Sequence, residues 1–176
     1  DYQAEIRYVA DLAKEPENRI LGIIASCRPE DDTGYSDWLD ECDDLGVVGY
    51  RRVLHVMDDD LSTTNTFRRN INALGGRQKP FDLCILPKQL TIGRELAKAC
   101  PNTTIVLNHC GVPDIAGGVL DPWRADMTAL AELGNVYCKL SGLLAYCAPG
   151  EATQAAINPY VEHVLEVFGP NRMVWG

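Results

Sequence analysis

Short apolar runs alternate along the chain with stretches in which apolar residues recur every three or four positions. The short runs are mostly apolar at successive positions, which is typical of strands covered on both faces, as in parallel sheets. They predict strands at Ile20–Ser26, Val47–Val53, Phe81–Leu86, Thr103–Asn108, Val136–Leu140 and Arg172–Trp175. The periodic stretches predict helices at Glu5–Lys14, Ser36–Leu45, Thr63–Ala73, Gln89–Ala99, Pro122–Leu133 and Ala155–Phe168.

Strand and helix repeat as a unit of about thirty residues, which implies right-handed crossovers and an α/β fold with a parallel sheet. Such a sheet is either closed as a barrel or open with helices on both faces, and periodicity alone does not separate the two. No linker or low-complexity segment interrupts the pattern. We therefore expect a single domain over residues 1–176.

Composition narrows the function classes. The formal net charge of −9 argues against a partner with a phosphate backbone, so no nucleic acid is expected. The apolar runs are far shorter than the roughly twenty residues that cross a bilayer, so no membrane partner is expected. Seven cysteines without a C-x-x-C pair, among them Cys84, Cys110 and Cys138 beside apolar runs, predict buried reduced thiols and a cytoplasmic location. The acidic run Asp58–Asp60 is read as a solvated loop.

Ligands of parallel α/β folds bind at the carboxyl ends of the strands, so the residues there are the first candidates for chemistry. His109 ends an apolar run and is followed by Cys110 and Gly111, where the chain must turn sharply. An imidazole there can bind a metal or move protons, or it can be hydrogen-bonded structurally beneath a loop. His55 and His163 are weaker candidates.

Four further polar residues lie in or after predicted strands. Arg51 and Arg52 are adjacent on one strand, so alternation allows only one to face a barrel interior. An inward arginine can bind a substrate carboxylate or lactone through forked hydrogen bonds, or it can form a structural ion pair. Lys139 and Ser141 share a face, which allows a nucleophilic Ser/Lys pair, although a structural role is favoured.

Several motifs together resemble one family, in order and over nearly the whole chain. They are G-Y-R-R-V-L at Gly49–Leu54, F-D-L at Phe81–Leu83, N-H-C-G-V-P-D at Asn108–Asp114, D-P-W at Asp121–Trp123, K-L-S-G at Lys139–Gly142 and F-G-P-N-R-M-V-W-G at Phe168–Gly176. The family is that of the amidohydrolase-related, metal-dependent barrel hydrolases, which includes L-fuconolactonase-like and 2-pyrone-4,6-dicarboxylate lactonase-like enzymes.

The resemblance implies a (β/α)₈ TIM barrel in which the six predicted strands are the third to the eighth. An H-x-H pair upstream and a catalytic aspartate after Gly176 are then expected in segments beyond both ends of this chain. The resemblance assigns His109 and Lys139 as catalytic, Arg51 and Ser141 as substrate-binding, and His109 as a metal ligand. Family members differ in metal use. The resemblance therefore makes a divalent metal, with zinc as the first candidate, an expected cofactor, and it leaves open whether one is required. Asp82 matches the F-D-L motif with no assigned role.

The activity that the resemblance implies is the opening of a lactone, either a sugar lactone or one of the pyrone or muconolactone type, by activated water, with polar groups stabilising the tetrahedral oxyanion. Leu143–Tyr146 follow K-L-S-G where dicarboxylate-binding members carry an arginine, which favours a less anionic substrate such as a sugar lactone. Two rivals stay open: a metal-dependent decarboxylase on the same barrel, and a catalytically inactive barrel relative or doubly wound binding protein. The expected partner is a small-molecule substrate, and a homo-oligomer is left open.

Overall fold

The computed structural model describes residues 1–176 and contains one six-stranded sheet. All neighbouring strands are parallel, and their spatial order is the order of the sequence. The strands are β1 (Ile23–Ser26), β2 (Val47–Val53), β3 (Phe81–Cys84), β4 (Ile105–Leu107), β5 (Val136–Leu140) and β6 (Met173–Trp175). Each predicted strand is present, and those at β2 and β5 have the predicted bounds.

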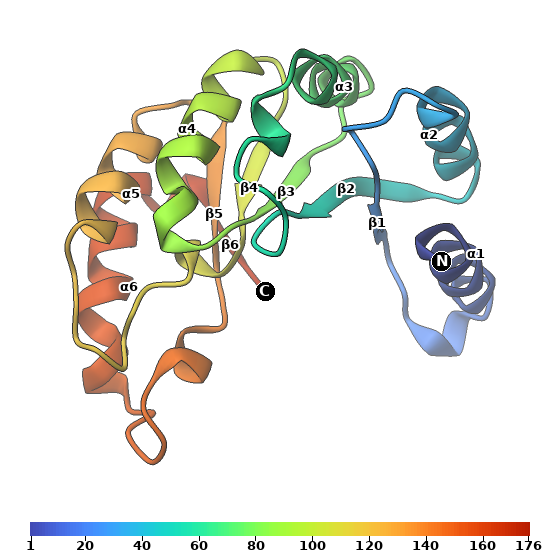
Figure 1. Cartoon of the computed structure of the whole chain (residues 1–176). Coiled ribbons are helices and arrows are strands. Elements are labelled where there is room, and N and C mark those ends of the chain that lie inside the picture. The colour runs from blue at the N-terminus through green and yellow to red at the C-terminus, as the bar shows by residue number, and fades with distance from the viewer.

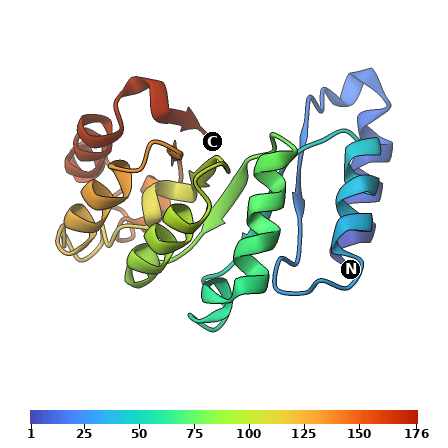
Figure 2. The same cartoon turned by 90° about the horizontal axis from the view of Figure 1, so that it is seen from above.

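Six helices connect or precede the strands. They are α1 (Tyr2–Ala13), α2 (Tyr35–Asp44), α3 (Asn65–Gly76), α4 (Leu90–Ala99), α5 (Trp123–Ala131) and α6 (Gln154–Phe168). Figure 1 shows α2 to α6 in an arc around the outside of the strands, with α1 beside β1, and Figure 2 shows the same arrangement from above. Because consecutive parallel strands are joined by crossovers of one hand, the helices lie on one face.

This arrangement decides between the two architectures that periodicity left open. An open doubly wound sheet reverses its strand order at a switch point and carries helices on both faces. Here the order β1 to β6 runs without reversal and the helices stay outside. The fold is therefore the curved wall of a TIM barrel, six βα units long, with β1 and β6 at its two edges.

The core lies between the sheet and the helices. Tyr50, Phe81, Ile105 and Val136 are partners in register on β2 to β5, and all four side chains are fully buried. The Tyr50 hydroxyl donates to the carbonyl oxygen of Leu39 on α2, which places this row on the helix side. Since alternate residues of a strand point to opposite faces, their neighbours point to the concave face.

One local prediction at a helix start is wrong. The sequence places Pro122 inside the first turn of α5, behind Asp121 as a capping carboxylate. In the structure α5 begins at Trp123, and the Asp121 carboxylate accepts a hydrogen bond from the guanidinium of Arg124 at 2.7 Å. The N-cap residue of α5 is Pro122, and no side-chain oxygen caps the helix. None of the six helices combines the length and the apolar character needed to cross a membrane.

Candidate functional site

The chain turns sharply after β4, as expected, and does so through a left-handed turn. His109, Cys110, Gly111 and Val112 all have positive φ, at 52°, 52°, 67° and 55°. The backbone N–H of Val112 donates to the carbonyl oxygen of His109 at 2.9 Å and closes the turn. Residues with a Cβ rarely adopt this conformation, and such strain gathers at functional sites. The turn presents the exposed His109 ring at the carboxyl edge of the sheet.

The imidazole of His109 contacts the residue that follows β5. Its Nδ1 lies 2.8 Å from the Ser141 hydroxyl oxygen, and the tautomer of the ring decides which group donates. Gly142 packs against the same ring, since a Cβ at this glycine would lie 3.1 Å from the His109 Nδ1. Two predicted site residues, His109 and Ser141, are thus in direct contact although they follow different strands.

Lys139 and Asp82 form the ion pair of the concave face. The Lys139 ammonium donates to Oδ2 of Asp82 at 2.6 Å, from β5 to β3. The Asp82 side chain is 8% exposed and that of Lys139 is 22% exposed, so the pair is largely shielded from water. The Lys139 ammonium is therefore bound to Asp82, while the Ser141 hydroxyl is bound to His109. The structure does not pair Lys139 with Ser141.

Although His109 is exposed overall, part of its ring is removed from water, which lowers the pKa of His109 below its usual value, and the positive charge of Lys139 lowers it further. The negative charge of Asp82 acts in the opposite direction and is the smallest of the three effects. The imidazole is therefore neutral at neutral pH. A neutral ring can accept a proton at one nitrogen while the other stays bonded to Ser141.

The two arginines of β2 point to opposite faces. Arg52 pairs with Glu30 at 2.9 Å and is buried on the helix side, as predicted. Arg51 is the register partner of Asp82, on the concave face. Its side chain is 43% exposed, its guanidinium lies 3.9 Å from the Glu5 carboxylate of α1, beyond hydrogen-bonding distance, and its buried Nε has no partner.

Two residues at the site, Asn108 and Cys84, were given no role from the sequence alone. The Asn108 amide, which is 8% exposed, contacts the Cys84 sulfur at 2.9 Å, and its Oδ1 has no partner. Cys84 was predicted to be buried. It is partly exposed, because it lies two residues after Asp82 and so shares the concave face, whereas Cys110 and Cys138 are fully buried as predicted. Burial raises the pKa of the Cys84 thiol.

The two remaining histidines have other surroundings. His163 on α6 is half-buried and its Nε2 lies 2.9 Å from the carbonyl oxygen of Arg124. His55 is exposed in the loop after β2, and its side chain makes no hydrogen bond. Neither contacts the His109 cluster, defined here as Arg51, Asp82, His109, Lys139 and Ser141.

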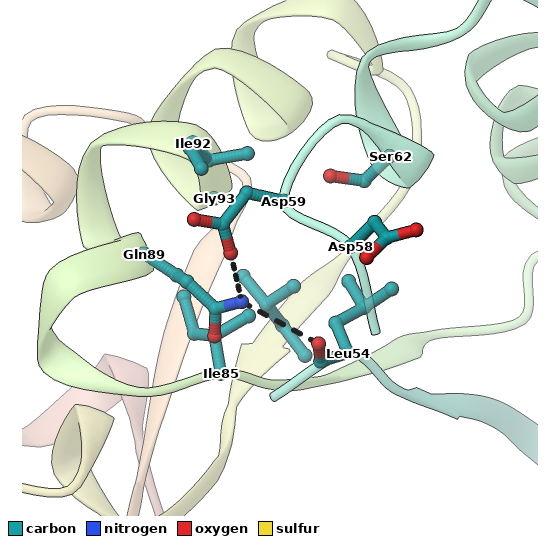
Figure 3. Close-up of a pocket in the computed structure, with 9 residues that line it drawn as sticks. Leu54, Asp58, Asp59, Ser62, Ile85, Gln89, Ile92 and Gly93 are labelled. Atoms are coloured by element: carbon teal, nitrogen blue, oxygen red, sulfur yellow. Dashed lines mark hydrogen bonds between the residues drawn. The ribbon is translucent and has the colours of Figure 1, made fainter. Parts of the chain in front are cut away.

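The acidic run Asp58–Asp60 has a structural role in part. Figure 3 shows a small cavity beside it, across which the buried Gln89 amide donates to Oδ1 of Asp59 at 2.7 Å and to the carbonyl oxygen of Leu54 at 3.4 Å. The cavity measures about 10 Å³, which is room for about one water molecule. The three aspartates are exposed, so the loop is solvated as expected, and Asp59 also ties it to the start of α4.

A larger apolar hollow of about 550 Å³ lies next to Ser141, between the ends of β5 and β6 and the helix α6. Leu140 and Trp175 line it from the strands, and Ile157 and Val161 line it from α6. Leu140 and Trp175 are register partners on the helix side of the sheet, so the hollow lies behind the concave face.

The residues of this chain do not by themselves fit a divalent metal. No group of three or more histidine, cysteine, aspartate or glutamate side chains comes together in a form that could hold one. The buried carboxylate on the concave face, Asp82, already neutralises an ammonium ion. His109 offers a free Nε2 as a single nitrogen ligand, and we derive no chemical step through a metal.

Comparisons with known proteins agree with the fold. An L-fucono-1,5-lactonase from Burkholderia ambifaria is 29% identical over 175 residues, which are 99% of this chain and 60% of that protein. A zinc-bound crystal structure of an amidohydrolase from Burkholderia multivorans, 25% identical, superposes with a TM-score of 0.89 over 99% of this chain and 63% of that one. A probable 2-pyrone-4,6-dicarboxylic acid hydrolase from Acinetobacter baumannii with bound citric acid, 19% identical, gives a TM-score of 0.76 over 100% of this chain and 62% of that one.

The chain thus spans a little under two thirds of the length of these relatives. The sequence model of the amidohydrolase family matches residues 1–176, from one end of the chain to the other. The resemblance seen in the motifs is thereby confirmed, and the chain belongs to the amidohydrolase family.

Proposed function

We propose that the protein carrying this chain opens a lactone by hydrolysis, with a sugar lactone as the substrate class. The observation that carries the proposal is the His109 cluster, in which a neutral imidazole contacts a serine hydroxyl at the carboxyl edge of a barrel sheet and an arginine lies on the same concave face. The family and the likeness to an L-fucono-1,5-lactonase support it.

Hydrolysis of a lactone needs a proton acceptor or donor near the attacking water and positive groups near the carbonyl oxygen. His109 can exchange a proton through Nε2, because Nδ1 is bonded to Ser141 and the ring is neutral at neutral pH. The positive charge of the Lys139 ammonium is already balanced by the Asp82 carboxylate. The pair therefore acts on the oxyanion as a dipole and not as a full positive charge. No carboxylate lies within hydrogen-bonding distance of Arg51. Its guanidinium is therefore assigned to bind an anionic or carbonyl oxygen of the substrate. Ser141 orients the imidazole and remains available to a substrate hydroxyl.

The substrate class follows from the charges near the cluster. A dicarboxylate would need several cations, whereas the cluster contains one arginine, Arg51, which lies 3.9 Å from the Glu5 carboxylate, and one lysine, which Asp82 already neutralises. Leu143–Tyr146, the short helical segment after K-L-S-G, adds no basic residue. A weakly anionic or neutral ligand with hydroxyl groups therefore fits better.

Three further points stay as proposals. The chain acts as one domain, as the third to eighth units of a barrel whose other units complete the site. A divalent metal, with zinc as the first candidate, is expected in the whole protein. The roles given to His109, Arg51, Lys139 and Ser141 do not depend on it. The seven free cysteines favour the reducing cytoplasm, and a homo-oligomer remains a prediction.

The test uses the natural protein that carries these residues. Proton release in a pH-stat is followed with L-fucono-1,5-lactone, with 2-pyrone-4,6-dicarboxylate and with a hydroxybenzoate, while released carbon dioxide is trapped. We expect ring opening of the sugar lactone at a kcat/KM at least tenfold, about 1.4 kcal/mol, above that of the dicarboxylate. Carbon dioxide release without lactone opening would identify a decarboxylase. No turnover of any of the three would favour the inactive relative.

A further inference from the structure

The left-handed turn at His109–Val112 needs support from its surroundings, because three of its four residues carry a Cβ and Val112 is also β-branched. Gly111 alone can adopt positive φ without strain. Part of the support is packing around Gly111, where an added Cβ would lie 2.8 Å from a methyl carbon of Leu90. Packing limits the volume of the turn but does not fix the direction of its peptide groups.

A directional contact comes from α5. The indole N–H of Trp123 donates to the carbonyl oxygen of Cys110 at 2.8 Å, and this hydrogen bond is buried. The Trp123 ring is 3% exposed and packs against the tilted ring of Tyr160 and edgewise against the ring of His163, at centroid distances of 5.3 and 5.6 Å. The ring therefore has little freedom to move, and a buried carbonyl that lost this donor would be left without a partner.

The bonded carbonyl belongs to the residue that follows His109, in the middle of the turn. Rotation of the Cys110 peptide group would change ψ of this residue and the path of the turn. The His109 ring would then lose its approach to the Ser141 hydroxyl, which lies 2.8 Å away across the end of β5. The orientation of His109 thus depends on a group that touches neither the ring nor the concave face.

We propose that Trp123 is a positioning residue for His109, which acts by holding the Cys110 carbonyl and with it the left-handed turn. This inference rests on the proposed function where it concerns catalysis, and on geometry alone where it concerns the orientation of the imidazole. The competing explanation is that Trp123 is a core tryptophan whose hydrogen bond serves stability only.

The chain offers a matched control. Trp38 on α2 is also 3% exposed, and its indole N–H donates to the carbonyl oxygen of Ser26, the last residue of β1, at 3.1 Å. Both tryptophans therefore join a helix to the carboxyl end of a strand by the same bond. Of the two, only Trp123 bonds to the turn that carries His109.

The experiment compares Trp123→Phe with Trp38→Phe in the natural protein. Each variant is examined by thermal unfolding, by lactone hydrolysis and by a crystal structure that gives the distance from the His109 Nδ1 to the Ser141 hydroxyl oxygen. Both variants should lose stability to a similar degree. Trp123→Phe should lower kcat at least tenfold with KM within about twofold, and should move the His109 ring out of contact with Ser141. Trp38→Phe should leave kcat and the contact between His109 and Ser141 unchanged.

If Trp123→Phe does not fold, replacement of Trp123 by benzothienylalanine removes the N–H and keeps the shape of the ring. An unchanged contact between His109 and Ser141 in whichever Trp123 variant folds would overturn the proposal, as would equal effects of the Trp123 and Trp38 variants. The crystal structure needs no substrate. A displaced His109 ring in a protein that hydrolyses no lactone would therefore support the positioning role and refute the proposed function.

Discussion

The Lys139 ammonium lies 2.6 Å from the Asp82 carboxylate across the concave face, with the whole of β4 between their two strands. This contact links the electrostatics of the site to His109, because both charges act on the pKa of the imidazole in opposite directions. Substitutions at either end of the pair should therefore move the titration of His109 in directions that can be stated beforehand.

Lys139→Met should raise the pKa of His109. The substitution removes a positive charge that opposes protonation of the ring, and it leaves the negative charge of Asp82, which favours protonation, without a counterion. Both changes have the same sign, so the acid limb of the rate profile should move to higher pH. NMR titration of His109 measures the shift. Lys98→Met, at an exposed lysine bonded to Glu95 on α4, is the control, and an unchanged or lowered pKa in Lys139→Met would contradict the prediction.

His109→Asn should lower kcat/KM for the lactone at least tenfold, or about 1.4 kcal/mol of transition-state stabilisation. Asparagine keeps a hydrogen-bonding group toward Ser141 but cannot exchange a proton near neutral pH. His55→Asn, at an exposed histidine with no side-chain hydrogen bond, should retain full activity. Equal turnover by the two variants would remove His109 from the site.

Arg51→Met and Arg52→Met should have separate effects. Arg51→Met should raise KM at least fivefold and change stability by less than about 1 kcal/mol, because its contact with Glu5 is partly exposed and 3.9 Å long. Arg52→Met should lower the free energy of unfolding by about 3 kcal/mol, since it leaves the shielded Glu30 carboxylate unpaired, with KM unchanged. Urea unfolding and steady-state kinetics measure both quantities, and a reversed pattern would exchange the roles of the two residues.

Gly142→Ala should reduce kcat, whereas Gly150→Ala should not. Both glycines have positive φ, at 75° and 81°, so each alanine should cost about 1–2 kcal/mol of stability. A Cβ at Gly142 would lie 3.1 Å from the His109 Nδ1, whereas nothing lies within 4 Å of one at Gly150. The His109 ring must then move away from Ser141 in Gly142→Ala only. Equal kcat values for the two variants would show that the ring tolerates the displacement.

Most of the fold could be predicted from the pattern of apolar residues, because strands covered on both faces leave short apolar runs. The bounds of β2 and β5 follow from it directly, whereas β4 is three residues long inside a predicted run of six. The spatial order of the strands, which runs from β1 to β6 without reversal, could not be predicted in this way. Strand order depends on which strands become neighbours in space, and a local period carries no information about that.

Site residues that follow the end of a strand, such as His109, could be predicted from the sequence. Contacts between site residues on different strands, such as that of Asp82 with Lys139, could not. Asp82 was left without a role, although Phe81 is buried on the helix side and alternation sends its neighbour to the concave face. Its partner Lys139 is 57 residues away, and no spacing rule connects the two. The left-handed conformation of Val112 could not be predicted either, since β-branched residues disfavour it.

The separation of Asp82 and Lys139 along the chain also has a consequence for synthesis on the ribosome. When β1 to β4 have left the exit tunnel, the Asp82 carboxylate has no counterion, because Lys139 arrives only with β5. An unpaired carboxylate resists removal from water, so the nascent sheet should stay loosely packed around Asp82 until β5 is added. Arrival of the lysine would then convert an electrostatic obstacle to collapse into an interaction that joins the early and late portions of the polypeptide.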